Sequence, residues 1–165
     1  MNNFSKKLNE LLVETYRQVT KIEEQAIRQD SKLDLTISEL HMLESVSKNK
    51  EGCTISFIAE DQGITLPSVT VAINKLTKKG YVEKQRAAHD GRQVLVKLTR
   101  EGRKVNAGHQ YFHENMVRNI IKEFDEEEQQ ALVKGIDKLN CFFKKKLEAV
   151  EAAEANKEKE KNEEE

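Results

Sequence analysis

Short polar and cationic side chains share one face of a helix predicted between residues 65 and 79. The hydroxyl of Thr65 can cap this helix, and Pro67 lies in its first turn, where a missing N–H has no partner to lose. Ser and Asn side chains hydrogen-bond base edges, Val packs on the methyl group of thymine, and Lys neutralises phosphate. The face is therefore a candidate for contact with double-stranded DNA, and the alternative is an ordinary solvated helix face. Its remaining members are Ser68, Thr70, Val71, Asn74, Lys75 and Lys78.

A loop with an arginine at each end, residues 86–92, separates two predicted β-strands that cover residues 81–85 and 93–98. Asp90 and the glycine after it favour a turn, and we expect Asp90 to hold the tip in shape by pairing with Arg92 or a nearby base. A loop that carries Arg86 and Arg92 beside a DNA-contacting helix can reach into the adjacent minor groove. The loop therefore extends the candidate DNA-binding surface.

Three of the four histidines can share one site with a carboxylate. His109 and His113 are four residues apart on one face of a predicted helix, and His41 lies on another helix. A histidine pair at this spacing can chelate zinc, which would accept His41 and a carboxylate such as Glu23 as further ligands. The alternative is a set of histidines that bond one another, a carboxylate or solvent.

Two short helices joined by a glycine turn must position the candidate DNA-binding residues. The first is predicted to begin at Thr54 and to end at Gly63, and the second ends at about Lys79, before Gly80. With the two strands that follow, this order predicts a mainly α fold with a small β-hairpin wing, which is a winged helix-turn-helix. The apolar stripe of the second helix consists of Leu66, Val69, Ile73 and Leu76.

Long amphipathic helices are predicted at both ends of the chain. A capping box from Thr36 to Glu39 opens one further helix, Thr99 can cap the helix after the wing, and Asp125 can cap the last one. These helices carry more apolar residues than one small lobe can bury, which indicates an obligate dimer with interlocking ends. We expect a single domain over residues 1–147. It comprises dimerisation helices at 1–35 and 99–147 and a DNA-binding module at 36–98, and a charged acidic tail follows at 148–165, either as a frayed helix or disordered.

Charge is divided unevenly along the chain. Residues 54–104 hold ten Lys and Arg and five Asp and Glu, a balance of +5, so the rest of the chain carries −6 within a formal total of −1. A basic module in an acidic scaffold is typical of phosphate contact.

The sequence has no phosphate-binding glycine loop and no nucleophile or metalloprotease motif, so we expect neither an enzyme nor a cofactor. The helices are too polar for a membrane span, and we expect Cys53 and Cys141 to be thiols in a reducing cytoplasm.

The chain resembles the MarR family of winged helix-turn-helix regulators up to about residue 147. The matching segments are LTISELHMLESV, TISFIAEDQGITLPSVTVAINKLTKKGYVEKQ and DGRQVLVKLTREGR. In the last segment, Asp90 and Arg92 fill the Asp-x-Arg signature of the family's wing, whereas Val71 stands where many members have an arginine. The resemblance implies a homodimer that binds an inverted repeat in DNA and responds to a small ligand.

Within that family the chain resembles the FabT-type repressors of bacterial fatty-acid synthesis. The segments that carry this likeness are KIEEQ, TISELHMLESV, GITLPSVTVAINKLTKKGYVEK and HQYFHENMV. It implies a long acyl chain on acyl carrier protein as co-repressor, held among the scaffold helices. Expected ligand-binding residues are His41, Met42, His109, Phe112, His113 and Met116, for which ordinary core packing is the alternative. A zinc-responsive MarR-type regulator that uses Glu23, His41, His109 and His113 is the alternative function.

Overall fold

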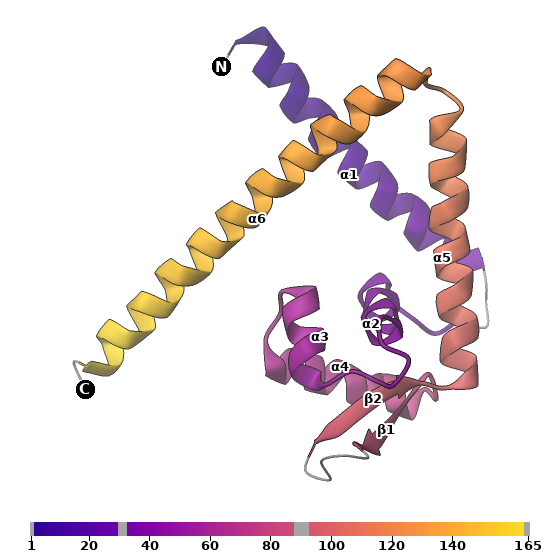
Figure 1. Cartoon of the computed structure of the whole chain (residues 1–165), viewed down its shortest axis with the longest axis vertical. Coiled ribbons are helices and arrows are strands. Elements are labelled where there is room, and N and C mark those ends of the chain that lie inside the picture. The colour runs from indigo at the N-terminus through magenta and orange to yellow at the C-terminus, as the bar shows by residue number, and fades with distance from the viewer. Residues whose placement is uncertain (1, 30–32, 88–92, 164–165) are drawn as a thin grey trace. The chain divides into compact units, whose positions relative to one another are not determined.

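Helices and one β-hairpin make up the part of the chain that the computed structural model describes, residues 2–29, 33–87 and 93–163 (Figure 1). The chain divides into two compact units, Met1–Phe112 and His113–Glu165. A mainly helical fold with a two-stranded wing confirms the predicted fold class. The elements are α1 (Asn3–Gln29), α2 (Ile37–Ser47), α3 (Ile55–Gln62), α4 (Leu66–Lys78), β1 (Val82–Arg86), β2 (Val94–Leu98), α5 (Arg100–Ile121) and α6 (Glu126–Glu163).

Local side-chain chemistry sets the ends of the two short helices. The Thr54 hydroxyl accepts a hydrogen bond from the backbone N–H of Phe57 at 3.1 Å and so caps α3. Gly63 ends that helix with a φ of 62°, a left-handed conformation that costs glycine nothing. Thr65 then caps α4 by accepting from the Ser68 N–H, and Pro67 lies in the first turn. The predicted caps of both helices and the glycine that ends the first helix are therefore confirmed.

The hairpin that follows α4 is antiparallel, and its register pairs Val82 with Leu98 and Arg86 with Val94. Tyr81, predicted to begin the first strand, lies outside it because its N–H bonds the Leu76 carbonyl in the turn that ends α4. Cys53 pairs with Val96 through two backbone hydrogen bonds of 2.9 and 2.8 Å, which adds a one-residue edge to the sheet. The tip of the wing, with Asp90 and Arg92, lies outside the described residues.

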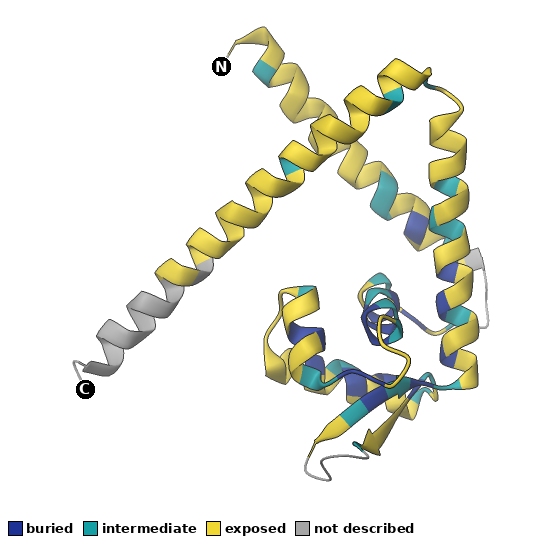
Figure 2. Cartoon of the chain, in the orientation of Figure 1, coloured by how far each residue is buried: buried dark blue, intermediate teal, exposed yellow. Residues whose placement is uncertain are grey.

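The hydrophobic core of the first unit lies among α2, α3, α4 and the hairpin, as the buried residues of Figure 2 show. Leu66 was predicted to join the apolar stripe of α4, but it is 49% exposed because it occupies the first position of the helix, before the stripe reaches the core. The largest fully buried side chains of this core are Leu43, Val46, Ile58, Val69, Ile73, Leu76, Val82 and Val96.

The second unit contains the long helix α6. Asp125 and Glu128 form a reciprocal capping box at its start, with both hydrogen bonds at 2.9 Å. The helix continues to Glu163, so the charged segment is helical from residue 148 to residue 163. None of the described helices combines the length and the apolar content that a bilayer-spanning segment needs. Exposed apolar side chains along α6 include Leu132, Ile136, Phe142, Phe143 and Leu147.

Candidate nucleic-acid interface and adjoining cavity

Helix α4 has one buried side and one exposed side, which separate its core residues from its candidate DNA-binding residues. Val69, Ile73 and Leu76 are fully buried, and this stripe fixes how the helix lies on the module. Val71, on the opposite side, is 55% exposed although it is apolar. The predicted DNA-binding residues in the described part of the chain are all exposed: Thr65, Pro67, Ser68, Thr70, Val71, Asn74, Lys75, Lys78 and Arg86.

Hydrogen bonds already orient several side chains on this exposed surface. The hydroxyls of Thr65 and Ser68 lie 2.9 Å apart, and the Thr70 hydroxyl donates to the Leu66 carbonyl at 2.9 Å. The Lys84 ammonium, which projects from β1, donates to the Asn74 side-chain oxygen at 2.7 Å. Hydrogen bonds within the chain thus link Thr65 to Ser68, Thr70 to Leu66 and Lys84 to Asn74 on this exposed surface.

A partly buried ion pair holds the C-terminal end of α4, and the sequence analysis missed it. The Lys79 ammonium donates to the Asp34 carbonyl oxygen at 2.6 Å and to both carboxylate oxygens of Glu39 at 3.0 Å. Burial alone would raise the pKa of Glu39, but the hydrogen bonds from the Thr36 N–H and from Lys79 outweigh it and keep the pKa below its ordinary value. The signal available in the sequence was the capping box, because it fixes where the Glu39 carboxylate lies.

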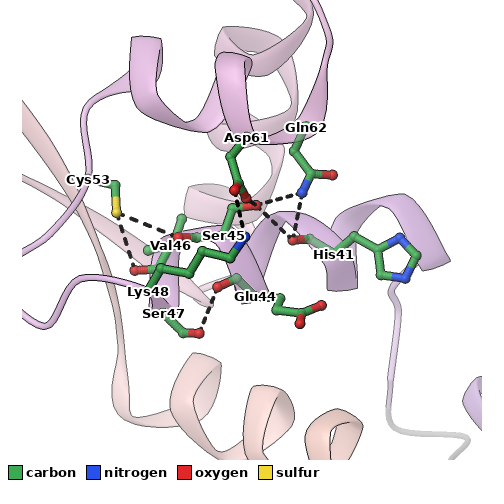
Figure 3. Close-up of polar contacts among 9 residues, drawn as sticks. All are labelled: His41, Glu44, Ser45, Val46, Ser47, Lys48, Cys53, Asp61 and Gln62. Atoms are coloured by element: carbon green, nitrogen blue, oxygen red, sulfur yellow. Dashed lines mark hydrogen bonds and ion pairs between the residues drawn. The ribbon is translucent and has the colours of Figure 1, made fainter. Parts of the chain in front are cut away.

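A polar cluster connects α2 to α3, the first helix of the helix-turn-helix (Figure 3). Asp61 accepts hydrogen bonds from the Ser45 hydroxyl and the Lys48 ammonium, and these bonds lower the pKa of Asp61. Gln62 donates to the Ser45 hydroxyl at 2.6 Å and to the His41 carbonyl oxygen at 3.4 Å. The imidazole ring of His41 points away from this cluster in Figure 3. His41 of α2 thus contacts α3 through its backbone carbonyl, while its side chain belongs to a different site.

That other site is a group of possible metal ligands in the first unit. Glu23 from α1, His41 from α2 and His109 from α5 each offer a ligand atom within 4.8 Å of the others. The rings of His41 and His109 have centroids 5.6 Å apart, and both Glu23 and His109 are buried. His113 follows His109 by one turn of α5 and is half-buried. One carboxylate and two imidazoles form a donor set that suits zinc.

A cavity of about 410 Å³ adjoins these ligands. Its lining comes from α1, from Leu33 and Leu40, from Tyr81 in the turn between α4 and β1, and from α5 between Glu101 and Phe112. Two predicted ligand-binding residues, His109 and Phe112, line it, whereas His41 lines a neighbouring groove beside α1. Met42, one position further along α2, points into the hydrophobic core and is 3% exposed. Met116 is half-buried and, with His113, belongs to the second unit.

The first turn of α5 lies directly against the residue that follows the helix-turn-helix. The Thr99 hydroxyl donates to the Gly80 carbonyl oxygen at 2.7 Å and accepts from the Gly102 N–H at 3.1 Å, so it caps α5 as predicted. A Cβ atom on Gly102 would lie 2.0 Å from the Tyr81 carbonyl oxygen. This position therefore requires glycine because of a close backbone approach.

A helix-turn-helix with an exposed polar second helix, followed by a two-stranded wing, defines a winged helix-turn-helix protein. The structure resembles that of Streptococcus pneumoniae FabT in complex with DNA, with a TM-score of 0.81. The sequences are 34% identical, and the match covers 85% of this chain and 97% of the FabT chain. The chain belongs to the MarR family of winged helix-turn-helix transcriptional regulators, as predicted, and this is a family of regulators and not of enzymes.

Sequence relatives agree with this assignment. The model of the SarA/Rot family of transcriptional regulators matches residues 27–108. The HTH-type transcriptional regulator YhjH of Bacillus subtilis is 26% identical over 65% of this chain, which spans only 61% of the length of YhjH. The transcriptional regulator ZitR of Lactococcus lactis is 29% identical over 70% of this chain and 80% of its own length.

Proposed function

We propose that the protein is a homodimeric repressor that binds an inverted repeat in double-stranded DNA and controls fatty-acid synthesis genes. In this proposal a long-chain acyl group on acyl carrier protein is the co-repressor, and the protein acts in the cytoplasm. The observation that carries the proposal is the 34% identity to FabT over 97% of that chain. The FabT-type repressors, which the sequence resembles, control bacterial fatty-acid synthesis.

Helix α4 and the wing supply the DNA-binding part of the proposal. The exposed face of α4 offers hydrogen-bonding and apolar groups to bases, and Lys75 and Lys78 follow on the same helix for phosphate. In the sequence, the wing from Lys84 through Arg92 adds further basic residues to those of α4.

Exposed apolar side chains support the homodimer. Those of α1 include Phe4, which is 74% exposed, and Tyr16, which is 73% exposed. Leu8, Leu11, Leu12 and Val13 of the same helix are 39–51% exposed. A single chain leaves this surface in water, and an apolar surface of this kind is typical of a protein–protein interface. The exposed apolar residues of α6 are a second candidate for burial in the dimer.

The cavity beside α5 is the proposed site for the acyl chain. Its volume of about 410 Å³ lies within the range of small-molecule pockets, and Ile27, Leu33 and Leu40 make part of its wall apolar. The cavity also borders the elements that hold α4. Tyr81 lies in the turn between that helix and β1, and Leu33 and Leu40 are the chain neighbours of Asp34 and Glu39, which bind Lys79. An occupant that binds more tightly to one arrangement of these residues stabilises that arrangement, and with it one position of α4. DNA affinity then changes by the difference between the affinities of the occupant for the two arrangements.

Gly108 offers a direct test, because a Cβ atom there meets nothing within 4 Å and the residue lines the cavity. We expect Gly108→Leu to place a bulky side chain in the cavity and so obstruct an acyl chain, to keep basal DNA affinity and to lose the tightening of DNA binding by long-chain acyl carrier protein. Gly135→Leu is the matched control, since Gly135 lies on α6 and a Cβ there also meets nothing within 4 Å. Binding curves measured with and without the acylated carrier protein check both. An unresponsive wild type would refute the acyl co-repressor and leave the DNA-binding assignment in place.

The cluster of Glu23, His41 and His109 favours a second candidate function, a zinc-responsive regulator. Within 4.8 Å of one another, the ligand atoms of these three residues need only a small closure to bind one ion. The Gln62 bond to the His41 carbonyl would connect the ion to α3. Under this alternative, added zinc changes DNA affinity, and a chelator restores the affinity measured without zinc. His109→Ala abolishes the effect of zinc. No effect of zinc on DNA affinity would exclude it.

A further inference from the structure

A second hollow, of about 310 Å³, lies on the opposite side of α5 from the cavity described above, and we call it the wing pocket. Helix α5 contributes Arg103, Asn106, Ala107 and Gln110 to its lining, and the helical repeat places these residues along one side of the helix. The other walls come from the end of α2, from the turn after it and from both strands of the wing. The described residues that line the wing pocket are all different from those that line the cavity, so it is a separate candidate site.

Asn106 is the most deeply buried polar residue of the wing pocket. It is 6% exposed, and its side-chain oxygen is buried without a hydrogen-bond partner among the described residues. A buried acceptor of this kind lowers stability, because it has lost its contact with water and has gained no donor in exchange. A hydroxyl group on a bound molecule would supply the donor that the free protein lacks at this position.

The charged residues of the wing pocket favour an anion. Lys50, Lys97 and Arg103 are cationic, and Glu83 is the one carboxylate among the described lining residues, which gives a balance of +2. Glu83 and Lys97 are paired in the register of the hairpin, next to the pair that begins it on the side away from the tip. A molecule bound in this pocket would therefore contact both strands at the base of the wing.

Two of these cations keep hydrogen-bonding capacity for a ligand. The Arg103 guanidinium donates to the Leu98 carbonyl oxygen at 2.7 Å, which holds the group in place and leaves its other N–H groups for an anion. The Lys97 ammonium lies 3.7 Å from a carboxylate oxygen of Glu51, whose side chain is 89% exposed. Solvent weakens this pair, so the lysine can bind a second anionic group.

We propose that the wing pocket binds a small organic anion that carries a hydroxyl group. Arg103 and Lys97 bind the anionic group, and the side-chain oxygen of Asn106 accepts a hydrogen bond from the hydroxyl. The cations alone would accept any anion of suitable size, whereas the buried acceptor selects a molecule that also has a donor. This site is independent of the proposed function, because binding there requires neither DNA nor an acyl chain.

Titration of the full-length protein with lactate and with glycerol 3-phosphate, followed by NMR, tests the proposal. Both probes carry a hydroxyl group, and the tighter of the two shows whether the pocket prefers a carboxylate or a phosphate. Propionate is lactate without the hydroxyl, and glycerol is glycerol 3-phosphate without the charge. Each of these is expected to bind at least about threefold more weakly than its partner, because it lacks one of the two groups that the pocket recognises. Absence of binding by both probes at millimolar concentrations overturns the proposal.

Arg103→Met locates the anion within the molecule. This variant is expected to weaken binding of both probes by about tenfold, because it removes a charged hydrogen-bond donor. Arg100→Met is the matched control, since Arg100 is an exposed arginine of the same helix that does not line the pocket. An equal loss of binding in the two variants would indicate a general attraction of anions to a basic surface, and would overturn the proposal.

Asn106→Leu supplies the decisive comparison. Leucine has a similar volume and no unpaired acceptor, so the unfolding midpoint of the free protein is expected to stay the same or to rise. The preference for lactate over propionate is expected to fall from about threefold or more to none. A clearly lower midpoint would show that the asparagine serves the fold and not a ligand. That result, or an unaltered preference for lactate, overturns the proposal.

Discussion

Ile73 and Val71 are aliphatic residues two positions apart on α4, yet their surroundings are opposite. Ile73 is fully buried in the core of the first unit, whereas Val71 is 55% exposed. Removing buried methyl groups costs the lost burial and leaves a cavity, while an exposed aliphatic side chain makes few contacts that folding depends on. The two residues therefore separate what the helix needs for stability from what it offers to a partner.

We expect Ile73→Ala to lower the free energy of unfolding by about 2–5 kcal/mol. Val71→Ala should change it by less than about 0.5 kcal/mol, because the site is exposed. Urea denaturation followed by circular dichroism measures both. Similar losses of stability in the two variants would contradict the described placement of α4 on the core.

At the scale of elements, the ion pair between Lys79 and Glu39 joins the end of α4 to the start of α2. Glu39 also accepts from the Thr36 N–H at 2.9 Å, so one carboxylate caps α2 and binds the lysine that ends α4. The side chain of Glu39 is only 9% exposed, and that of Lys79 is 26% exposed. A hydrogen-bonded charge pair with this little exposure is screened less by solvent than a surface pair.

The lowered pKa of Glu39 gives this pair a pH dependence. Because the folded state binds the proton less tightly than the unfolded state, Glu39 contributes stability that is complete above its ordinary pKa of 4.5 and is lost as pH falls through the lowered value. We expect Glu39→Gln to reduce stability by about 1–2 kcal/mol at pH 7 and by less below pH of about 4. Thermal unfolding across this range measures the difference. Glu60→Gln, at an exposed position of α3, is the control, and an equally large loss in that variant would contradict a specific role for Glu39.

Helix ends could be predicted from sequence, whereas contacts between distant residues could not. The caps at Thr36, Thr65 and Asp125 involve residues three positions apart, so the sequence alone brings their atoms together. The bond from Lys79 to Asp34 joins residues 45 positions apart, and that from Lys84 to Asn74 depends on how the hairpin packs against α4. Met42 lies in the hydrophobic core, which is the alternative given for it, and helical spacing alone does not tell which of two apolar sides faces the core.

At the scale of the whole molecule, charge and exposed apolar surface are the features that one chain leaves unmatched. The balance of +5 over residues 54–104 contrasts with −6 elsewhere. The apolar residues exposed on α1 lie outside the core of the first unit. The first feature fits a polyanion, and the second fits another copy of the chain.

DNA affinity is expected to fall steeply with salt, because each lysine that neutralises a phosphate releases a counterion. Lys78→Ala should lower affinity about equally for all sequences and reduce the slope of log affinity against log salt by about one. Lys134→Ala, on α6, should leave that slope unchanged. Titrations at several salt concentrations measure it, and an identical slope for all three proteins would exclude Lys78 from phosphate contact.

The unfolding midpoint is expected to rise with protein concentration, since a dimer is favoured by mass action. Leu11→Glu, which introduces a charge at a 51% exposed leucine of α1, should remove this dependence and yield monomers in sedimentation experiments. Phe57→Glu is the control: Phe57 is 41% exposed but lies on α3, outside the predicted dimerisation helices. A midpoint independent of concentration in the wild type would rule out an obligate dimer.

The close approach of Gly102 to Tyr81 also limits how this sequence can vary. Because a Cβ atom would lie 2.0 Å from the Tyr81 carbonyl oxygen, even alanine would push the start of α5 away from the end of the helix-turn-helix. Gly135, where a Cβ atom meets nothing within 4 Å, carries no such restriction. If every codon were randomised and cells were selected for repression, position 102 would stay glycine, while position 135 would accept alanine and many other residues. Any sequence that adopts this fold with the same contact between the start of α5 and residue 81 therefore needs glycine at position 102.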